Sequence, residues 1–291
     1  MAQQSLTDAD IITALQASGY LLEQDVATVL ESHDFLVQTS RAFLDPDEGK
    51  SREMDVWAYK QVFRDEGQRL SVSLELICEC KNKGNPLVFL SRLRNRADRS
   101  AVPNEYVFPV AESIGYVPPG VSDFQTRPFY RLGLDKQHYY YSQDTKYVQF
   151  CVLSQKGKVW QANHNGLYDS VFYPLVKAMT YRRNEMHGSI DTKTSGGWRN
   201  VWLFFMLAVF TCDMFRMGAT TNLLRVQPTE HVMFTRELSS KSINGKFAVD
   251  FVTLAGLSAA VTGSIMPFAE ATAALLQASP DQFIEARQPR P

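Results

Sequence analysis

The stretch Leu74-Glu75-Leu76-Ile77-Cys78-Glu79-Cys80-Lys81 decides the fold of this chain. In an extended strand successive side chains point to opposite faces, so the odd-numbered residues share one side and the even-numbered residues share the other. The even side is apolar and can pack, while the odd side carries carboxylates and an ammonium group. Placing Glu79 and Lys81 beside such a hydrophobic run is costly unless each is paired or binds an ion. A divalent cation held by Glu79 and the upstream Asp55 accounts for this placement.

The residues before this strand predict a helix followed by two further strands. Thr7 can cap a first helix, and Gly19 is suited to end it. In a second helix, apolar residues recur at helical spacing and leave Glu23 at the margin of the stripe: Leu22, Val26, Val29 and Leu30. Strands are predicted over 35–40, 54–63 and 70–81, with turns at 45–49 and 65–67. The order is helix, strand, strand, strand.

The order of Asp55 and then Glu79-Cys80-Lys81 resembles the PD-(D/E)xK phosphodiesterase superfamily, which has the restriction-endonuclease-like fold. Residues 56 to 78 leave room for a hairpin between the two motifs. The stretch 18–27 looks like the first core helix of that fold, in which a glutamate, here Glu23, points toward the metal site. Runs 49–55 and 77–81 are similar to uncharacterised bacterial members whose nuclease domain carries a longer C-terminal part. The resemblance covers about residues 18 to 90 well and the remainder loosely.

This resemblance implies an α/β fold with a central mixed β-sheet flanked by helices, and additional strands and a helix at the C-terminus. Asp55 and Glu79 would supply oxygen ligands to Mg²⁺, for which Mn²⁺ can substitute. Lys81 would orient or activate the attacking water, or stabilise charge on the phosphate. Glu23 would bind the ion directly or through water. The family also implies the peptide oxygen of Cys80 as a ligand.

A shifted assignment of the acidic residues stays open. Glu53 shares the parity of Asp55, and Glu75 shares that of Glu79. Both lie further from the Glu-x-Lys motif and are therefore ranked lower.

A run of basic residues follows the Glu-x-Lys motif. Residues 87 to 100 are predicted to be helical, either throughout or after a short extended piece, and residues 81 to 100 contain six Lys and Arg against one acid, Asp98. The run is either a phosphate-contacting surface or a solvated helix face, and the sequence favours neither. Under the first interpretation the nucleic-acid contacts are Lys83, Arg92, Arg94 and Arg96.

Composition limits the class of protein. The 291 residues are 45% hydrophobic, which is ample for a core, and the formal net charge of −1 leaves no global basic field for nucleic acid. The four cysteines form no C-x-x-C pair, which favours reduced thiols in a cytosol. The N-terminus has no apolar core typical of a signal peptide. The apolar stretch 251–269 predicts a strand followed by a packed helix, so we expect a soluble cytoplasmic protein without a membrane partner.

The second half of the chain predicts more strands. A strand is expected over 147–153 and a long helix over 167–184, whose C-terminal basic residues suit the negative end of the helix dipole. After a polar linker at 187–197, the segments 201–210 and 213–217 are predicted to form a hairpin or a buried strand with its turn. Strands at 232–236 and 246–254 and a helix at 267–277 follow.

This organisation predicts three parts of the chain. Residues 1–186 would form the nuclease-like core with insertions, and 198–278 a strand-rich extension packed on it. That extension would either continue the same sheet or form its own. Residues 279–291 would be a flexible tail.

Three functional hypotheses follow. The first is a Mg²⁺-dependent nuclease that hydrolyses DNA in restriction, repair or phage defence, with RNA left open as a substrate; the resemblance also allows a homodimer. The second is an inactive nuclease fold that binds nucleic acid or a protein. The third is a structural or toxin-like interaction protein in which Glu79 and Lys81 form only a buried ion pair.

Overall fold

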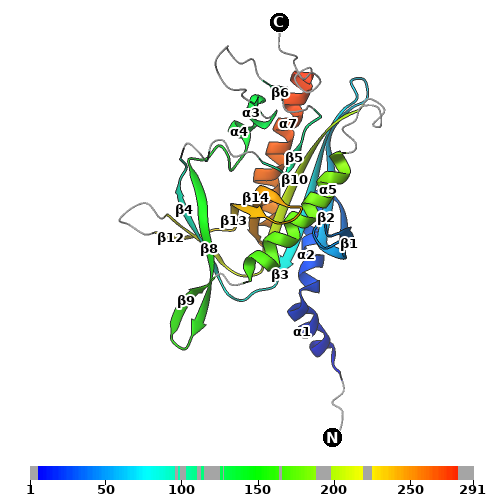
Figure 1. The fold of residues 1–291 in the computed structure, drawn as a ribbon. Helices are drawn as coiled ribbons and strands as arrows, with labels where there is room; N and C mark the ends of the chain where they lie inside the picture. The colour runs from blue at the N-terminus through cyan, green and yellow to red at the C-terminus, as the bar shows by residue number, and fades with distance from the viewer. Residues whose placement is uncertain are drawn as a thin grey trace.

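The computed structural model describes residues 6–95, 98, 103–109, 113–114, 125–126, 128–163, 166–187, 198–218 and 225–280. Two large β-sheets, a two-stranded pair and a set of helices build the described part of the molecule, and helices cover both faces of the largest sheet (Figure 1). The predicted α/β class is therefore confirmed.

The larger sheet, called sheet A, has the strand order β1-β2-β3-β10-β14-β13, with the short β5 paired to β10. Strand β10 is parallel to both β3 and β14, whereas the other neighbours are antiparallel, so the sheet is mixed. Its strands are β1 (Leu36–Leu44), β2 (Ser51–Asp65), β3 (Leu70–Lys81), β5 (Tyr106–Val107), β10 (Arg199–Phe210), β13 (His231–Ser239) and β14 (Asn244–Thr253).

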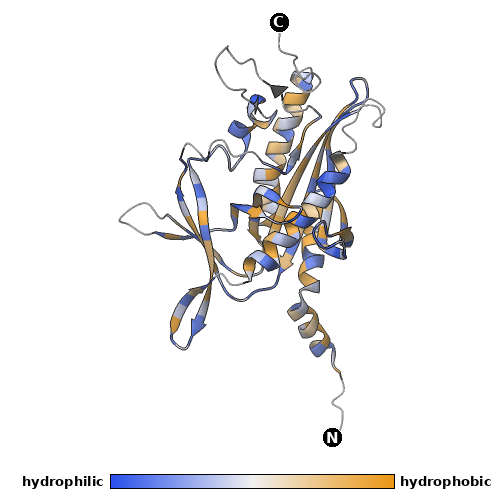
Figure 2. Cartoon of the chain, in the orientation of Figure 1, coloured by the Kyte–Doolittle hydropathy of each residue, from blue (hydrophilic) through white to orange (hydrophobic). Residues whose placement is uncertain are grey.

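The two central strands are apolar on both sides. All residues of β3 from Leu70 to Cys78 are buried, and in β10 the residues from Val201 to Phe210 are buried apart from Trp202. Such continuous runs are typical of parallel strands that are covered on both faces. Figure 2 shows these strands in the hydrophobic colour at the centre of the molecule. The expected strand over 70–81 is confirmed with the same bounds.

Helices from the two ends of the chain pack on the face of sheet A that carries the even-numbered side chains of β3. They are α2 (Tyr20–Glu31), α6 (Leu257–Ala260), the π-helical turn η4 (Val261–Ile265) and α7 (Met266–Ala278). Two short helices from the middle of the chain, α3 (Pro128–Arg131) and α4 (Leu134–Gln137), pack on the same face. Among the described residues one helical segment, Leu257–Ala278, is long and apolar enough to cross a membrane. Much of its apolar surface packs in this core, which agrees with the strand and packed helix predicted over 251–269.

Helix α5 (Tyr173–His187), preceded by the π-helical turn η2 (Tyr168–Phe172), covers the opposite face of sheet A. Beside it lies a second sheet, called sheet B, in the order β12-β11-β4-β8-β9. Its strands are β4 (Leu87–Leu93), β8 (Thr145–Lys156), β9 (Val159–Asn163), β11 (Met214–Gly218) and β12 (Val226–Pro228); a separate pair joins β6 (Ser113–Ile114) and β7 (Gln125–Thr126).

One prediction for these segments is wrong. The helix expected over 87–100 is strand β4 from Leu87 to Leu93, where Leu87 and Phe89 are buried and Val88 and Leu90 are only partly buried. Pairing with β8 and β11 overrides the helical preference of the sequence. Of the two alternatives for 201–210 and 213–217, the structure has the buried strand with its turn and not the hairpin. Strand β10 belongs to sheet A and β11 to sheet B, and β10, β13 and β14 extend the sheet of the N-terminal half.

The N-terminal helices follow the prediction. Helix α1 (Asp8–Ser18) begins at a capping box in which the Thr7 hydroxyl accepts the Asp10 N–H, and the Asp10 carboxylate accepts from Thr7. It ends at Gly19, whose φ of 89° lies in the left-handed region that favours glycine. In α2, the predicted stripe residues Leu22, Val26 and Leu30 are buried.

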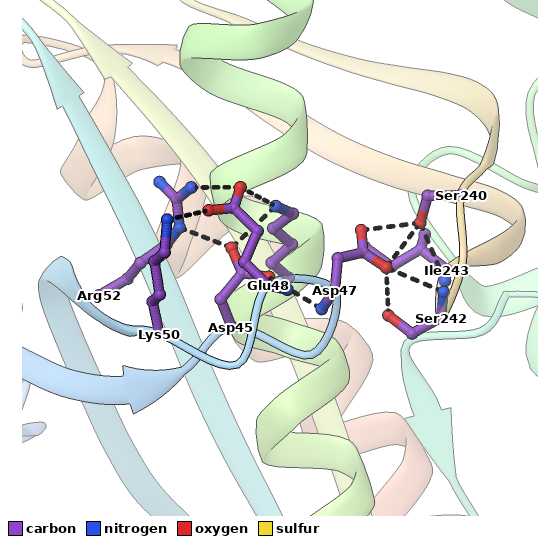
Figure 3. A network of polar contacts seen from close by, with 9 residues as sticks. Asp45, Asp47, Glu48, Lys50, Arg52, Ser240, Ser242 and Ile243 are labelled. Atoms are coloured by element: carbon purple, nitrogen blue, oxygen red, sulfur yellow. Dashed lines mark hydrogen bonds and ion pairs between the residues drawn. The ribbon is translucent and has the colours of Figure 1, made fainter.

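The turn between β1 and β2 is fixed by a polar network (Figure 3). Asp45 is fully buried, and its carboxylate accepts from Lys177 of α5 at 2.8 Å and from Arg52 at 2.5 Å. Asp47 binds Ser240 and Ser242 in the turn between β13 and β14. The network therefore ties β2 to α5 and to the far edge of sheet A, and it fixes the strand that carries Asp55.

Candidate functional site

The candidate site lies where β2 separates from β3. The backbone ladder between these strands ends at the pair Val56 and Cys78. Beyond it, Asp55 Oδ2 accepts a hydrogen bond from the backbone N–H of Cys80 at 2.7 Å. Strand β3 meanwhile stays paired with β10 as far as Lys81. The Asp55 carboxylate thus accepts from the Cys80 amide, which lies beyond the last backbone pair between β2 and β3. This hydrogen bond fixes the orientation of the carboxylate.

Glu79 and Lys81 meet on one face of β3, as the strand alternation requires. The Nζ atom of Lys81 lies 2.5 Å from Glu79 Oε1. The Lys81 side chain is 23% exposed and the Glu79 side chain is 12% exposed. The ion pair is therefore largely, but not fully, shielded from water. Asp55 precedes Val56, the last β2 residue paired with β3, and Glu79 follows its partner Cys78, so both carboxylates lie just beyond the end of the ladder.

The carboxylates of the site influence one another. Burial raises the pKa of Glu79 to about 7, and the charge of Asp55 adds to this increase, while Lys81 opposes it. Burial also raises the pKa of Asp55, against the hydrogen bond from Cys80 and the charge of Lys81. The pKa of Glu23, on α2, is raised by partial burial and then by Asp55. The structure therefore brings all four predicted catalytic residues into one electrostatic cluster.

The donor set of this cluster suits a hard cation. Asp55, Glu79 and Glu23 offer carboxylate oxygens, the ligand type that Mg²⁺ prefers. Across the described residues, however, no three His, Cys, Asp or Glu side chains are gathered closely enough to hold an ion. In the present arrangement, Lys81 occupies one oxygen of Glu79 and a backbone amide occupies one oxygen of Asp55.

Cys80 contributes no thiolate to the site. Its side chain belongs to the hydrophobic core on the even-numbered face of β3, and burial raises the pKa of the thiol above its ordinary value. The thiol is therefore protonated at neutral pH. If Cys80 is a ligand, it acts through its peptide oxygen.

Glu75, one of the shifted alternatives, has another role. It is fully buried, and its carboxylate accepts from Trp57 Nε1 at 2.7 Å and from two nitrogens of Arg182 at 2.9 and 2.7 Å. Glu53, the other alternative, is exposed on β2. Arg182 lies near the C-terminal end of α5, where the sequence predicts only an interaction with the helix dipole, and it neutralises the buried Glu75. A glutamate inside an apolar central strand is the sequence signal for such a buried base.

The predicted nucleic-acid contacts differ in availability. Arg92 is exposed at the end of β4, and Lys83 is partly exposed beside Thr211. Arg94 is engaged internally, because it donates to the carbonyls of Tyr140 and Thr145 and lies over the Tyr140 ring. Arg96 lies outside the described residues.

A cavity that the sequence does not predict lies near the C-terminal end of β3. It has a volume of about 980 Å³ and lies at the C-terminal ends of β10 and β14. Thr211 lines it and also binds Asn82, the residue after Lys81. His231 lines it as well and is held by the buried Asp250 at 2.6 Å. C-terminal ends of parallel strands are common ligand-binding positions.

Comparison with known proteins adds no relative. No protein-family model, no curated protein and no solved structure matches this chain.

Proposed function

We propose that this protein is a Mg²⁺-dependent nuclease of the restriction-endonuclease-like fold that hydrolyses DNA phosphodiester bonds in the cytoplasm. The observation that carries the proposal is the convergence of Asp55, Glu79 and Lys81 where β2 parts from β3. The order of α2, β1, β2 and β3 is the helix and three strands that the resemblance implies. Helix α5 and strand β10 follow later in the chain, with β10 parallel to β3.

The side chains divide the work as follows. Asp55 and Glu79, assisted by Glu23, would hold the cation through carboxylate oxygens. The bound ion would supply a water of lowered pKa and oppose negative charge on the phosphoryl group. Lys81 carries a positive charge within hydrogen-bond reach of Glu79, so it can orient the attacking water or donate to a phosphate oxygen. The Cys80 amide orients Asp55, but the carboxylates of Asp55, Glu79 and Glu23 would have to move closer together to hold one ion.

Ion binding must compete with protonation of Glu79. The pKa of this residue is about 7 as a result of burial and of the neighbouring Asp55, so near neutral pH a large share of the molecules carry a proton there. A metal ligand has to be ionised. The proposal therefore includes an activity that rises from slightly acidic to slightly alkaline pH.

The test is cleavage of supercoiled plasmid, linear duplex and single-stranded DNA, and RNA, with Mg²⁺ or Mn²⁺. We expect Asp55→Asn, Glu79→Gln and Lys81→Met each to reduce the rate by about 100-fold or more. Glu53→Gln is the matched control, because Glu53 is an exposed carboxylate two residues from Asp55 on the same strand. A wild-type protein that leaves every form of DNA intact with either ion would refute the proposal.

A second candidate function is a catalytically inactive module that binds nucleic acid or a protein. The close Lys81 to Glu79 ion pair favours it, because both side chains already have a partner without any ion. Binding of DNA that persists in Asp55→Asn, together with no turnover in the wild type, would support this candidate instead.

A further inference from the structure

A pocket with a volume of about 280 Å³ lies where sheet B meets the far edge of sheet A. Its walls come from the residue that follows β4, the turn 138–142, the start of β8, and strands β13 and β14. We call it the basic pocket, because cations and tyrosine rings make up most of its lining: Arg94, Lys146, Lys246, Tyr140, Tyr141 and Tyr147.

The basic pocket is separate from the candidate nuclease site. Lys83 precedes β4, whereas Arg94 follows it. Strand β4 has 7 residues and is therefore roughly 20 Å long. The two sites thus lie near opposite ends of this strand, and the proposed metal site does not account for the charges of the basic pocket.

The Arg94 guanidinium is held in place by groups that leave its charge unneutralised. Its Nε atom donates to the carbonyl of Thr145, and its Nη2 atom donates to the carbonyl of Tyr140, each at 3.1 Å. The guanidinium also lies 4.2 Å from the centroid of the Tyr140 ring. Both carbonyls are neutral, and a guanidinium has further N–H donors beyond those that these bonds use. Arg94 therefore presents a fixed positive charge with unused donors at the pocket.

Asp98 is the one carboxylate among the described residues that line the basic pocket. It accepts from Lys146 Nζ at 2.5 Å and from the backbone N–H of Asn95 at 2.8 Å. Burial would raise the pKa of Asp98, but these two hydrogen bonds and the charges of Lys146 and Lys246 hold the pKa below its ordinary value. Asp98 is therefore ionised at neutral pH and neutralises one of the three cations, which leaves two uncompensated.

Lys246 forms no ion pair with any described residue. It lies on β14 opposite Glu237 of β13, but Glu237 is exposed and its carboxylate is not bound to the ammonium group. The Lys246 side chain is itself partly buried. Partial burial of an ammonium group without a counter-ion is costly, and a bound anion would offset this cost.

Two tyrosine hydroxyls add neutral donors. Tyr141 and Tyr147 are partly buried, and their hydroxyls make no hydrogen bond to the described residues. Burial, followed by the charge of Glu105, raises the pKa of Tyr141 well above its usual value, so this hydroxyl stays protonated and can donate. Tyr140, in contrast, is paired with Thr235 at 3.2 Å. Unused donors therefore outnumber unused acceptors, which predicts a ligand that accepts hydrogen bonds and carries negative charge.

A second pocket, of about 340 Å³, adjoins the basic pocket and shares Arg94, Asp98 and Tyr141 with it. Its carboxylates outnumber its cations. Besides Tyr130 and Lys136, the remaining lining carries hydrogen-bond acceptors: Asp135, Ser142, Gln143 and Asp144. Carboxylate and amide oxygens suit the hydroxyl groups of a sugar, whereas a second anionic group would be repelled there. The two pockets therefore favour different ends of one ligand.

We propose that the two pockets together bind a sugar phosphate, either free or as part of a mononucleotide. The phosphate would lie in the basic pocket, where Arg94, Lys246 and Tyr141 supply donors from three separate elements. Donors from several directions suit a tetrahedral oxyanion better than a planar carboxylate. The sugar hydroxyls would lie toward the adjoining pocket. Because Arg94 is already held by two carbonyls, little of its freedom is lost on binding.

A nucleic-acid backbone fits these pockets less well. It carries a phosphate at every nucleotide. A strand that placed one phosphate beside Arg94 and Lys246 would bring the next toward the carboxylates of the adjoining pocket. A sugar phosphate or a mononucleotide has its negative charge at one end, so the charge pattern favours the small ligand.

The first experiment is calorimetric titration of the full chain with adenosine monophosphate, ribose 5-phosphate, ribose and inorganic phosphate. EDTA is present, so that no metal-bound phosphate contributes. We expect both phosphorylated sugars to bind, inorganic phosphate to bind more weakly, and ribose not to bind. Equal affinities for the two phosphorylated sugars would identify the sugar phosphate as the recognised unit, and tighter binding of adenosine monophosphate would identify the mononucleotide.

The second experiment places the ligand with variants. Lys246→Gln removes an ammonium group that forms no ion pair with the described residues, so it should weaken binding of the phosphorylated sugars about tenfold and leave the fold intact. Lys241→Gln is the matched control, because it removes an exposed lysine between β13 and β14, and it should bind like the wild type. Tyr141→Phe removes only a hydroxyl and should weaken binding by a smaller factor. Lys81→Met should leave this binding unchanged. Thermal unfolding checks that each variant is folded.

Several outcomes would overturn the inference. No binding of either phosphorylated sugar at millimolar concentration excludes it. Equal binding by Lys246→Gln and the wild type would place the ligand elsewhere. Inorganic phosphate that binds as tightly as the phosphorylated sugars would reduce the basic pocket to a general anion site. A DNA duplex whose binding is lost in Lys246→Gln, with no binding of the small probes, would assign the pocket to nucleic acid. None of these measurements uses nuclease activity, so they stand or fall separately from the proposed function.

Discussion

The Asp55 carboxylate lies 2.7 Å from the backbone nitrogen of Cys80, a residue 25 positions later in the chain. This bond gives Asp55 a structural role in addition to the proposed catalytic one. We expect Asp55→Ala to lower the free energy of unfolding by about 1 to 2 kcal/mol, because the buried amide loses its acceptor. Asp55→Asn keeps an oxygen and should lose less.

Denaturant unfolding of the two variants measures this difference, with Glu53→Gln as the exposed control. Both Asp55 variants should lack metal-dependent activity. Equal stability of the alanine and asparagine variants would contradict the structural role.

Glu79→Gln should stabilise the protein at alkaline pH. Burial, with the charge of Asp55, raises the pKa of Glu79 from 4.5 to about 7. Below about pH 4.5 both the folded and unfolded states hold the proton; as the pH rises, the unfolded state releases it first, so the folded state loses stability until about pH 7. The shift corresponds to at most about 3 kcal/mol, reduced by the loss of a partner for Lys81. Unfolding at about pH 5 and about pH 8 should show a gain only at the higher pH. A pH-independent difference would rule this out.

Metal binding should stabilise the fold in a pH-dependent way. A ligand that binds only the folded state raises its stability by mass action. Because Glu79 must be ionised to bind, Mg²⁺ should raise the melting temperature more at about pH 8 than at about pH 6. Glu79→Gln should remove most of this increase, and Glu53→Gln should keep it. An identical Mg²⁺ effect in all three proteins would mean that the ion binds elsewhere.

Asp45 should be a major determinant of acid stability. Burial alone would raise its pKa, yet the hydrogen bonds from Lys177 and from two backbone N–H groups hold the pKa at about 2. This contribution is present above the ordinary value of 3.8 and is lost as the pH falls toward 2, about 2 kcal/mol in total.

We expect Asp45→Asn to cost about 2 to 3 kcal/mol at neutral pH, because Lys177 keeps only the more distant Glu48. The acid-unfolding midpoint should also move. The exposed Asp34→Asn is the control, and a variant with the acid midpoint of the wild type would contradict the assignment.

The pair of Glu75 and Arg182 should show strong coupling in a double-mutant cycle. Arg182→Met leaves the fully buried Glu75 without its cation and should destabilise the fold by about 3 to 5 kcal/mol. Glu75→Gln in the same background keeps an acceptor for Trp57 and should recover part of this loss. Additive effects in chemical denaturation would show that the two side chains act independently.

Much of the N-terminal half followed from residue patterns alone. The Thr7 cap, the Gly19 stop and the stripe of α2 are local features, and each was found at the predicted residue. The sequence also predicts strand β3 with its observed bounds, because its apolar run leaves few alternatives to a buried central strand. The helix predicted at 87–93 is wrong. This segment is a strand because pairing with β8 and β11, which are distant in the chain, outweighs the helical preference of its residues.

The sequence by itself determined which residues alternate along β3, and hence that Glu79 and Lys81 share a face, because strand geometry is local. Only the tertiary structure decided that Asp55 reaches the amide of Cys80, that Arg182 neutralises Glu75, and that β10 lies parallel to β3 on the side away from β2. These contacts join segments that are distant in the chain, and their energies depend on burial, which no local pattern records.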